Sequence, residues 1–353
     1  MKAVSVERLE EGMVLARTVT NDEMVIILSE GMTLDGASID RLKLLDIPVV
    51  YIKDDFDLSK NFQQASAVIK KDSAFTHDFE KVSKLANEVF DHLREGKDAK
   101  EPTEKFAAHV LPMADNSGSI DYLFNLGHLN NSVTLHCVRV SIISGIIGKW
   151  MHFDWEEIRT LVTSALLHDA GKINFPENIV GKLPEELNGD DLQIYAGHCK
   201  EGYDLLKKAK FSEPIPTVAL SHHERMNGSG FPNALRGDKI HPFARIVAVA
   251  DAYDILTAEH EGSVKRTPFH AVNFFTKELY SNFDPVVCIP LVTRIKDSLI
   301  GSNVKLSDGR IGTVAFYPND FSALPIISFD DGTEEDLNHA RVTIKEYNVT
   351  VSI

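Results

Sequence analysis

The chain has 353 residues, 43% hydrophobic and 25% charged, which is ordinary for a globular protein and long enough for two or three domains. Its formal net charge of −15 argues against broad binding to DNA or to anionic membranes. No apolar run has the length of a membrane span or a signal peptide, and three cysteines give no disulfide framework. We therefore expect a cytoplasmic protein that binds neither DNA nor membrane.

Residues 1–60 are predicted to form a small α/β module. Short apolar runs predict strands at 13–15, 24–28 and 49–52, and residues 36–45 have the pattern of a short helix. Nothing in this pattern points to a catalytic role for the module.

Residues 61–112 are predicted to form a polar, mostly helical connector. Apolar residues recur at helical spacing at Phe79, Val82, Leu85, Val89 and Leu93. This spacing favours a packing or dimer-forming helix, so a homodimer is one expected assembly. Gly96-Lys97-Asp98 and Glu101-Pro102 are predicted to interrupt the helix.

Residues 113–298 are predicted to be predominantly helical, and residues 301–353 to be β. Asp154 and Glu157 have the spacing of a capping box, which predicts a helix that starts at this point. In the C-terminal part, apolar runs separated by turn signals predict a small antiparallel, barrel-like module. The expected fold class is therefore multidomain and mainly α, with a small α/β module first and a small β module last.

Five short segments, each expected within a helical stretch, carry metal-binding chemistry. They are His136, His168-Asp169, His198, His222-His223 and Asp251. Imidazole and carboxylate are the ligands that zinc, manganese and iron share. A single histidine on an apolar helix is more often a satisfied core residue, but five such segments in one chain favour a metal centre.

The order of these segments resembles the HD phosphohydrolase superfamily. The stretch from His222 to Arg225, followed by Asn227 to Pro232, is similar to the HD-GYP family, with Phe231 where that family has tyrosine. Members of that family hydrolyse cyclic di-GMP in bacteria. The resemblance implies a central all-α HD-GYP domain at 113–298 and a metal-dependent phosphodiesterase that acts in second-messenger signalling with protein partners.

The resemblance also implies a ligand set for two metal ions. His136, His168, Asp169 and Asp251 would hold one ion, and Asp169 would bridge to a second ion held by the residues His198, His222 and His223. Some relatives bind a third metal through a carboxylate at the position of Ser132, which is a poor ligand here, so two ions are expected. The family favours iron or manganese, and the donor set also suits zinc.

Two adjacent metals lower the pKa of a bound water and neutralise phosphate oxygens, so further cations should lie nearby. Asp169 and Lys172 are the expected catalytic residues, Lys172 three residues beyond Asp169 at the same helix end. The other expected contacts to substrate are Arg225, Gly228, Gly230, Phe231, Pro232 and Arg245.

Several departures from the family pattern leave the activity open. Phe231 lacks the family hydroxyl, Asn227 replaces a carboxylate, and Glu259–Glu261 would repel an anionic ligand. The alternatives are a cyclic-dinucleotide-binding signalling module with little or no turnover, and a metallophosphohydrolase for another nucleotide. Cys137 and Cys199 each follow a candidate ligand, and burial as small apolar side chains is the favoured interpretation of both.

Overall fold

The computed structural model describes most of the chain, in two compact units. The described residues are 2–6, 9–16, 18–20, 26–29, 31–45, 47, 49–52, 58–115, 132–176, 179, 182, 186–258, 266–279, 281–318 and 320–347, with side chains in α2 from residue 75 onward. One unit comprises Met1–Gln64 and Thr293–Ile353, and the other comprises Ala65–Val292. Glu259–Glu261, the segment expected to repel an anionic ligand, lies outside the described residues.

The N-terminal part contains two small antiparallel sheets and one helix. Strand β1 (Lys2–Ser5) pairs with β4 (Val49–Ile52), and β2 (Val19–Thr20) pairs with β3 (Ile26–Leu28). Helix α1 (Gly36–Leu44) begins where the Asp35 carboxylate accepts a hydrogen bond from the Ser38 amide at 2.8 Å. The strand expected at 13–15 is reduced to single bridges at Val14 and Leu15, since each pairs with a different segment.

The C-terminal part is a five-stranded antiparallel sheet of order β8-β7-β6-β5-β9. Its strands are β5 (Asn303–Leu306), β6 (Ile311–Phe316), β7 (Ile326–Ser328), β8 (Glu334–Asp336) and β9 (Ile344–Tyr347). The antiparallel character is as predicted. Among the described residues β8 and β9 are the edge strands, and closure into a barrel stays a prediction.

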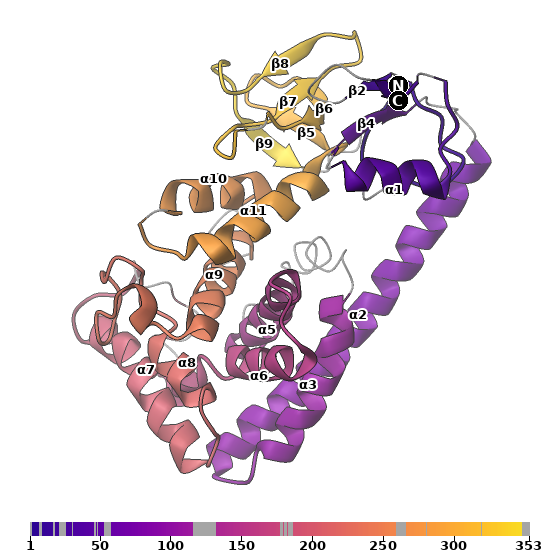
Figure 1. Ribbon diagram of the computed structural model, residues 1–353. Helices are drawn as coiled ribbons and strands as arrows, with labels where there is room; N and C mark the ends of the chain where they lie inside the picture. Colours follow the sequence, from indigo (N-terminus) through magenta and orange to yellow (C-terminus); the bar gives the residue numbers. More distant parts are fainter. Residues whose placement is uncertain are drawn as a thin grey trace. The chain divides into compact units, whose positions relative to one another are not determined.

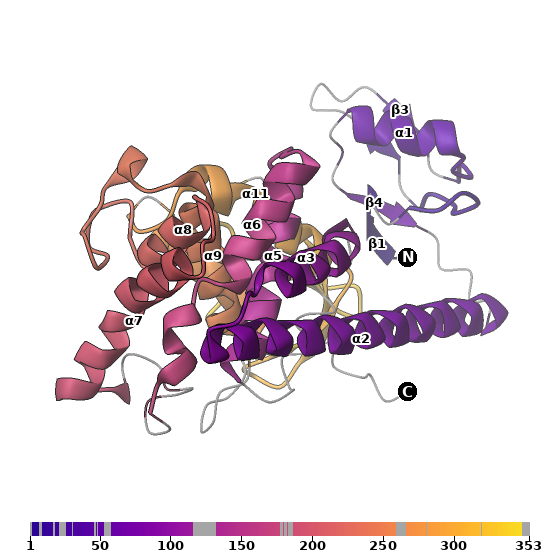
Figure 2. The same cartoon turned by 90° about the horizontal axis from the view of Figure 1, so that it is seen from below.

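The larger unit is helical (Figures 1 and 2). The helices after β4 are α2 (Leu58–Glu95), α3 (Lys100–Asp115), α5 (Val133–Trp150), α6 (Trp155–Leu166), the short helix η2 (Ala170–Asn174), α7 (Gly189–Lys208), α8 (Ile215–Ser221), η4 (Gly237–Lys239), α9 (Pro242–Thr257), α10 (Pro268–Glu278) and α11 (Pro285–Leu299). All belong to the larger unit except α2 up to Gln64 and α11 from Thr293. No helix within the described part of the chain combines the length and apolar character that a membrane span requires.

The break between α2 and α3 falls at the predicted glycine. Gly96 has a φ of 68° directly after α2, a conformation that favours glycine and ends helices. Pro102, expected to interrupt the helix as well, instead lies in the first turn of α3. Proline is tolerated there because the first amide groups of a helix have no partner within the helix.

Helix α5 is the centre of the larger unit. Every residue from Cys137 to Gly148 is buried, as expected for a helix that is apolar on all sides. It packs against α3, α6 and α9. The neighbouring α6 starts with the predicted capping box, in which Asp154 and Glu157 exchange two hydrogen bonds of 2.9 Å. Because α6 and α9 pack on α5, His136 in the first turn of α5 lies close to the C-terminal ends of α6 and α9.

Candidate metal centre

The structure brings all seven predicted ligand side chains into one buried cluster. His136 lies in the first turn of α5, His198 in the middle of α7 and Asp251 in α9. The two adjacent pairs differ from the helical placement expected for them. His168-Asp169 follows the end of α6, and His222-His223 follows the end of α8, because both helices terminate just before these residues.

Asp169 lies at the middle of this cluster and turns its two oxygens in different directions. Its Oδ1 lies 3.3 Å from Nε2 of His198 and 3.6 Å from Nε2 of His222. Its Oδ2 lies 3.5 Å from Nε2 of His168 and 3.8 Å from Nε2 of His136. One carboxylate therefore faces two separate sets of imidazole nitrogens.

The backbone fixes which nitrogen each of three histidines presents. The Nδ1 atoms of His168, His198 and His222 hydrogen-bond the carbonyl oxygens of the residues three positions earlier, Ala165, Tyr195 and Ala219. A carbonyl only accepts, so each Nδ1 carries the proton and each Nε2 keeps a lone pair. All three lone pairs belong to the nitrogens that lie near Asp169.

His136 reaches the same state through a carboxylate. Its Nδ1 donates to Oδ2 of Asp254 at 2.8 Å, and Asp254 also accepts two hydrogen bonds from the buried Arg139, of 2.6 and 2.9 Å. The His136 Nε2 lies 3.1 Å from Oδ1 of Asp251. Burial lowers the pKa of His136, but the two carboxylates outweigh it and raise that pKa to about 9.

Two glycines let α7 approach the segment that follows Asp169. A Cβ atom on Gly171 would lie 2.0 Å from the carbonyl oxygen of His198, and a Cβ on Gly202 would lie 3.1 Å from the amide nitrogen of Gly171. Only glycine allows the two backbones to come this close. The contact sets the position of His198 relative to Asp169.

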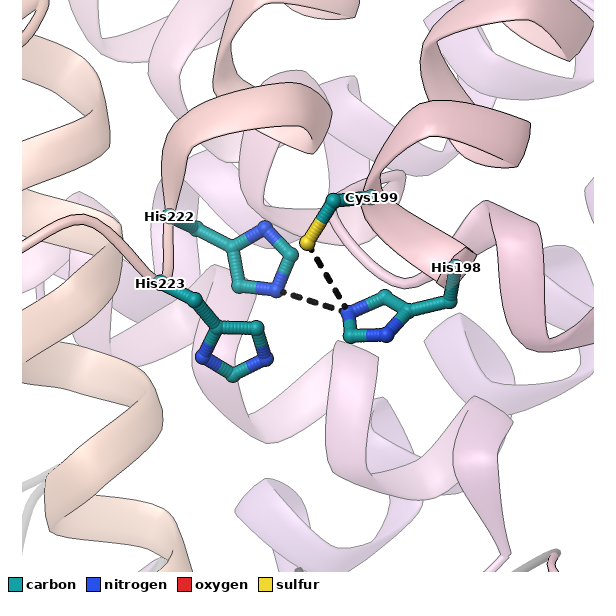
Figure 3. A group of neighbouring side chains, drawn as sticks. All are labelled: His198, Cys199, His222 and His223. Carbon is teal, nitrogen blue, oxygen red and sulfur yellow. Dashed lines mark hydrogen bonds between the residues drawn. The ribbon is translucent and has the colours of Figure 1, made fainter. Parts of the chain in front are cut away.

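The donor set of this cluster fits metal ions. Figure 3 shows the rings of His198, His222 and His223 converging, and the Nε2 atoms of His198 and His222 lie 3.3 Å apart, both unprotonated. Nε2 of His168, Oδ1 of Asp169 and Nε2 of His223 are buried without a hydrogen-bond partner. Unpaired buried polar atoms are unfavourable, and a shared cation would satisfy them together. Burial also lowers the pKa of His168 to about 4 and of His198 to about 3, which keeps both neutral and able to bind metal.

Lys172 provides a fixed positive charge beside the cluster. Its Nζ lies 2.7 Å from Oδ2 of Asp169 and 4.8 Å from the centre of the Tyr195 ring. Burial by itself lowers the pKa of Lys172, but the Asp169 carboxylate more than compensates and raises it above the usual value. Burial raises the pKa of Tyr195 to about 12, so its hydroxyl keeps its proton at neutral pH.

The glycine-rich loop after His223 packs directly on the cluster. A Cβ on Gly230 would lie 2.3 Å from the carbonyl oxygen of His223, so the close approach requires glycine. The Phe231 ring stacks on the His223 ring at 4.7 Å between centroids, with 29° between planes. Glu224 holds the loop, because its two carboxylate oxygens accept from the amides of Asn233 and Leu235, both at 2.8 Å. Gly228 has a φ of 78°, and Pro232 ends the motif.

Both arginines expected to contact substrate are engaged within the protein. Arg225 donates to the carbonyl oxygens of His222 and Glu224 and lies 4.9 Å from the centre of the Phe283 ring. Arg245 donates to the Ile240 carbonyl and to Asp284, each at 3.0 Å. These contacts stabilise the loop region, and substrate contact by either arginine stays a prediction.

Comparison with known proteins gives the family of this region. Residues 125–287 match the HD domain family. Over these residues the chain is similar to HD domains. The chain is 32% identical over 184 residues to the cyclic di-GMP phosphodiesterase response regulator RpfG of Xanthomonas campestris, covering 51% of this chain and 46% of that protein. It is 33% identical over 129 residues to the 3'3'-cGAMP-specific phosphodiesterase 2 of Vibrio cholerae, covering 36% of this chain and 23% of that protein.

The chain thus spans less than half the length of these two curated relatives. A solved structure, Bd1817, an HDG"Y"P protein from Bdellovibrio bacteriovorus, matches with a TM-score of 0.52 and 20% identity, over 84% of this chain and 98% of that chain. At this identity the match concerns the fold alone. Together the comparisons confirm the resemblance to HD-GYP proteins that the motifs indicated.

Two residues beside the cluster, Tyr195 and Arg139, were not predicted from the sequence. Tyr195 lies three residues before His198 and Arg139 three residues after His136, so both share a helix face with a candidate ligand. A buried arginine in an apolar helix is itself a sign of an acidic partner. Asp254 lies one helical turn after Asp251 and hydrogen-bonds His136. Glu224 lies in the motif stretch from His222 to Arg225, and its hydrogen bonds to Asn233 and Leu235 were not predicted.

Proposed function

We propose that this chain is a metal-dependent phosphodiesterase of HD-GYP type that hydrolyses cyclic di-GMP or a related cyclic dinucleotide. The observation that carries the proposal is the two-sided environment of Asp169, with separate imidazole sets facing Oδ1 and Oδ2. The names of RpfG and of the cGAMP-specific enzyme support the substrate class.

Two divalent ions fit this arrangement. His136, His168, Asp251 and Oδ2 of Asp169 would hold one, and His198, His222, His223 and Oδ1 of Asp169 would hold the other. Iron or manganese are the proposed ions, with zinc as the alternative suited to the same donors. When bound, the ions supply a nucleophilic water at neutral pH and neutralise the charge on the phosphodiester.

The remaining steps belong to the side chains around the cluster. Asp169 orients both halves of the site, since its carboxylate is held by Lys172 and faces four imidazole nitrogens. The Lys172 ammonium provides a permanent cation where negative charge grows on the phosphoryl oxygens. The Tyr195 hydroxyl, protonated at neutral pH, is available as a hydrogen-bond donor. Phe231 positions His223 through the stacked rings.

A turnover assay tests the proposal. The chain is purified without oxygen, loaded with iron or manganese, and mixed with cyclic di-GMP, 3'3'-cGAMP or cyclic di-AMP, and linear products are measured by chromatography. Elemental analysis of the same sample gives the metal content. Hydrolysis of at least one cyclic dinucleotide that depends on added metal supports the proposal. Absence of product with every metal and every cyclic dinucleotide overturns it.

The same assay separates the two alternatives. Binding of a cyclic dinucleotide with no product would favour a signalling module, for which Phe231 and Asn227 are the motivating departures. In the structure Asn227 bonds to Asn282 and to the Ser229 amide, both at 2.9 Å, so it serves the loop. Hydrolysis of other phosphoesters alone would favour a metallophosphohydrolase for another nucleotide.

A further inference from the structure

Two cysteine thiols lie beside the cluster and are absent from the proposed ligand set: Cys137 near His168 and Asp169, and Cys199 near His198, His222 and His223. The Sγ atom of Cys199 lies 3.5 Å from Nε2 of His198 and is directed at it (Figure 3). Ligand atoms of His198, Cys199, His222 and His223 all lie within 4.8 Å of one another, and all four residues are buried. The thiol thus faces the same small volume as three imidazoles.

The separations are those of atoms that share an ion. With metal–nitrogen bonds of about 2.1 Å and metal–sulfur bonds of about 2.3 Å, neighbouring ligands of a five-coordinate ion lie about 3.0–3.6 Å apart for two nitrogens and about 3.1–3.8 Å for nitrogen and sulfur. The observed distances are 3.3 Å between His198 and His222 and 3.5 Å between His198 and Cys199.

A hydrogen bond from the Cys199 thiol cannot satisfy all the histidine nitrogens that surround it. His198 and His222 both present an unprotonated Nε2, because each Nδ1 proton is donated to a backbone carbonyl. Nε2 of His223 is buried without any partner, and only 8% of that residue is exposed. The single S–H proton of Cys199 can serve only one of these nitrogens. A cation would satisfy all three nitrogens and the sulfur.

We propose that Cys199 is a thiolate ligand of the metal ion held by His198, His222, His223 and Asp169. The inference rests on the metal centre of the proposed function and changes its donor set. On binding, the S–H bond breaks, the proton passes to solvent, and the sulfur electron pair forms the bond to the ion. A coordinating thiol is deprotonated outright, so this step requires no oxidant or reductant.

A thiolate changes which ion this half of the site prefers. Sulfur is a softer donor than imidazole or carboxylate and favours zinc, iron or cobalt over manganese. The ion in this half would then be selected by sulfur as well as by imidazole and carboxylate. Cys199 would therefore be a specificity-determining residue for the metal.

Cobalt(II) is the probe that reports the sulfur directly. The full chain is stripped with a chelator, reduced, and titrated with cobalt(II) without oxygen. Visible d–d bands report bound cobalt, and an intense near-ultraviolet charge-transfer band reports a cobalt–thiolate bond. Cys199→Ser should keep the visible bands and lose the charge-transfer band. Cys288→Ser, which removes a buried thiol that is in neither group of ligand atoms, should keep both bands, and the comparison is repeated with Cys137 also replaced by serine, because Cys137 lies beside His168 and Asp169.

The outcomes separate this inference from the function on which it rests. Visible bands without a charge-transfer band in the unmodified chain, or a charge-transfer band that survives when both Cys199 and Cys137 are replaced by serine or is lost with Cys137→Ser alone, would overturn the thiolate assignment and leave the metal centre standing. No cobalt bands at all would remove the metal centre itself, and the inference with it. X-ray absorption of the unmodified cobalt protein should show a sulfur scatterer in the first shell, and its absence would overturn the assignment even if Cys199→Ser fails to fold.

Discussion

The carboxylate of Asp254 accepts the Nδ1–H of His136 at 2.8 Å while it also binds the buried guanidinium of Arg139. This arrangement orients the His136 ring so that Nε2 is left for Asp251 and Asp169. Carboxylate partners of this kind hold a ligand histidine in one tautomer and raise its basicity. The orientation of the ligand side chain His136 thus depends on Asp254 and Arg139, which are not themselves proposed ligands.

Replacing Asp254 tests this dependence. Asp254→Asn should weaken metal affinity by about 10–100-fold, because the amide no longer fixes the charge and tautomer of His136. It should also lower the free energy of unfolding by about 3–5 kcal/mol, since Arg139 would lose its buried partner. Metal titration and urea unfolding measure the two effects. Asp204→Asn, at an exposed ion pair with Lys200, is the control and should change neither.

Asp169→Asn should remove at least one metal ion. A neutral amide is a poor bridge between two cations, whereas the carboxylate offers one oxygen to each imidazole set. The helical core should remain folded, although the melting temperature falls as stabilisation by the bound metal is lost. Elemental analysis of the purified variant gives the metal count per chain. Two metals at full occupancy would contradict the bridging role of Asp169.

Gly171→Ala should destabilise the chain by about 1–3 kcal/mol, because the added Cβ would lie 2.0 Å from the His198 carbonyl oxygen. The matched control is Gly197→Ala in α7, where the nearest atom is Glu201 Oε1 at 3.6 Å. That helical substitution should be stabilising by up to about 1 kcal/mol. Urea unfolding compares the two variants. Equal stability would show that the close approach of Gly171 to α7 does not constrain the site.

Phe231→Tyr should change activity by no more than about fivefold. A hydroxyl that finds a partner contributes on the order of 1 kcal/mol, and the ring would keep its stacking on His223. Phe231→Leu, which removes the aromatic contact, should be the more harmful change. Turnover rates of the two variants are compared with the unmodified chain. If Phe231→Tyr turned an inactive protein into a fast phosphodiesterase, the Glu259–Glu261 segment would not be the main obstacle.

The metal-free chain should be most stable near neutral pH. Burial lowers the pKa of His168 to about 4, below the value of about 6.5 in an unfolded chain. The unfolded state then binds more protons between these values, so stability is present above pH 6.5 and lost as pH falls towards 4, by about 3 kcal/mol for this residue. The pKa of His136 is raised to about 9, so its contribution is present below pH 6.5 and lost as pH rises towards 9.

Urea unfolding at a series of pH values, in the presence of a chelator, measures this profile. His168→Gln should flatten the acid side, because glutamine does not titrate, while the alkaline side remains. An acid side as steep in His168→Gln as in the unmodified chain would show that His168 is not responsible for it.

Local sequence determined where several elements begin and end. The Asp154–Glu157 capping box and the break at Gly96 involve residues a few positions apart, and helix geometry alone decides such contacts. The five histidine and aspartate segments could also be identified from the sequence, because their residue types and their order along the chain indicate metal binding.

Tertiary packing decided how these segments meet. Asp254 is 118 residues from His136, and the facing of Asp169 towards two imidazole sets depends on how α6, α7 and α8 pack. Periodicity shows which face of a helix is buried, but not which residue lies opposite it. For that reason the contact of Arg225 with Phe283, the pairing of Arg245 with Asp284 and the approach of His222 to His198 emerged only when the helices were in place.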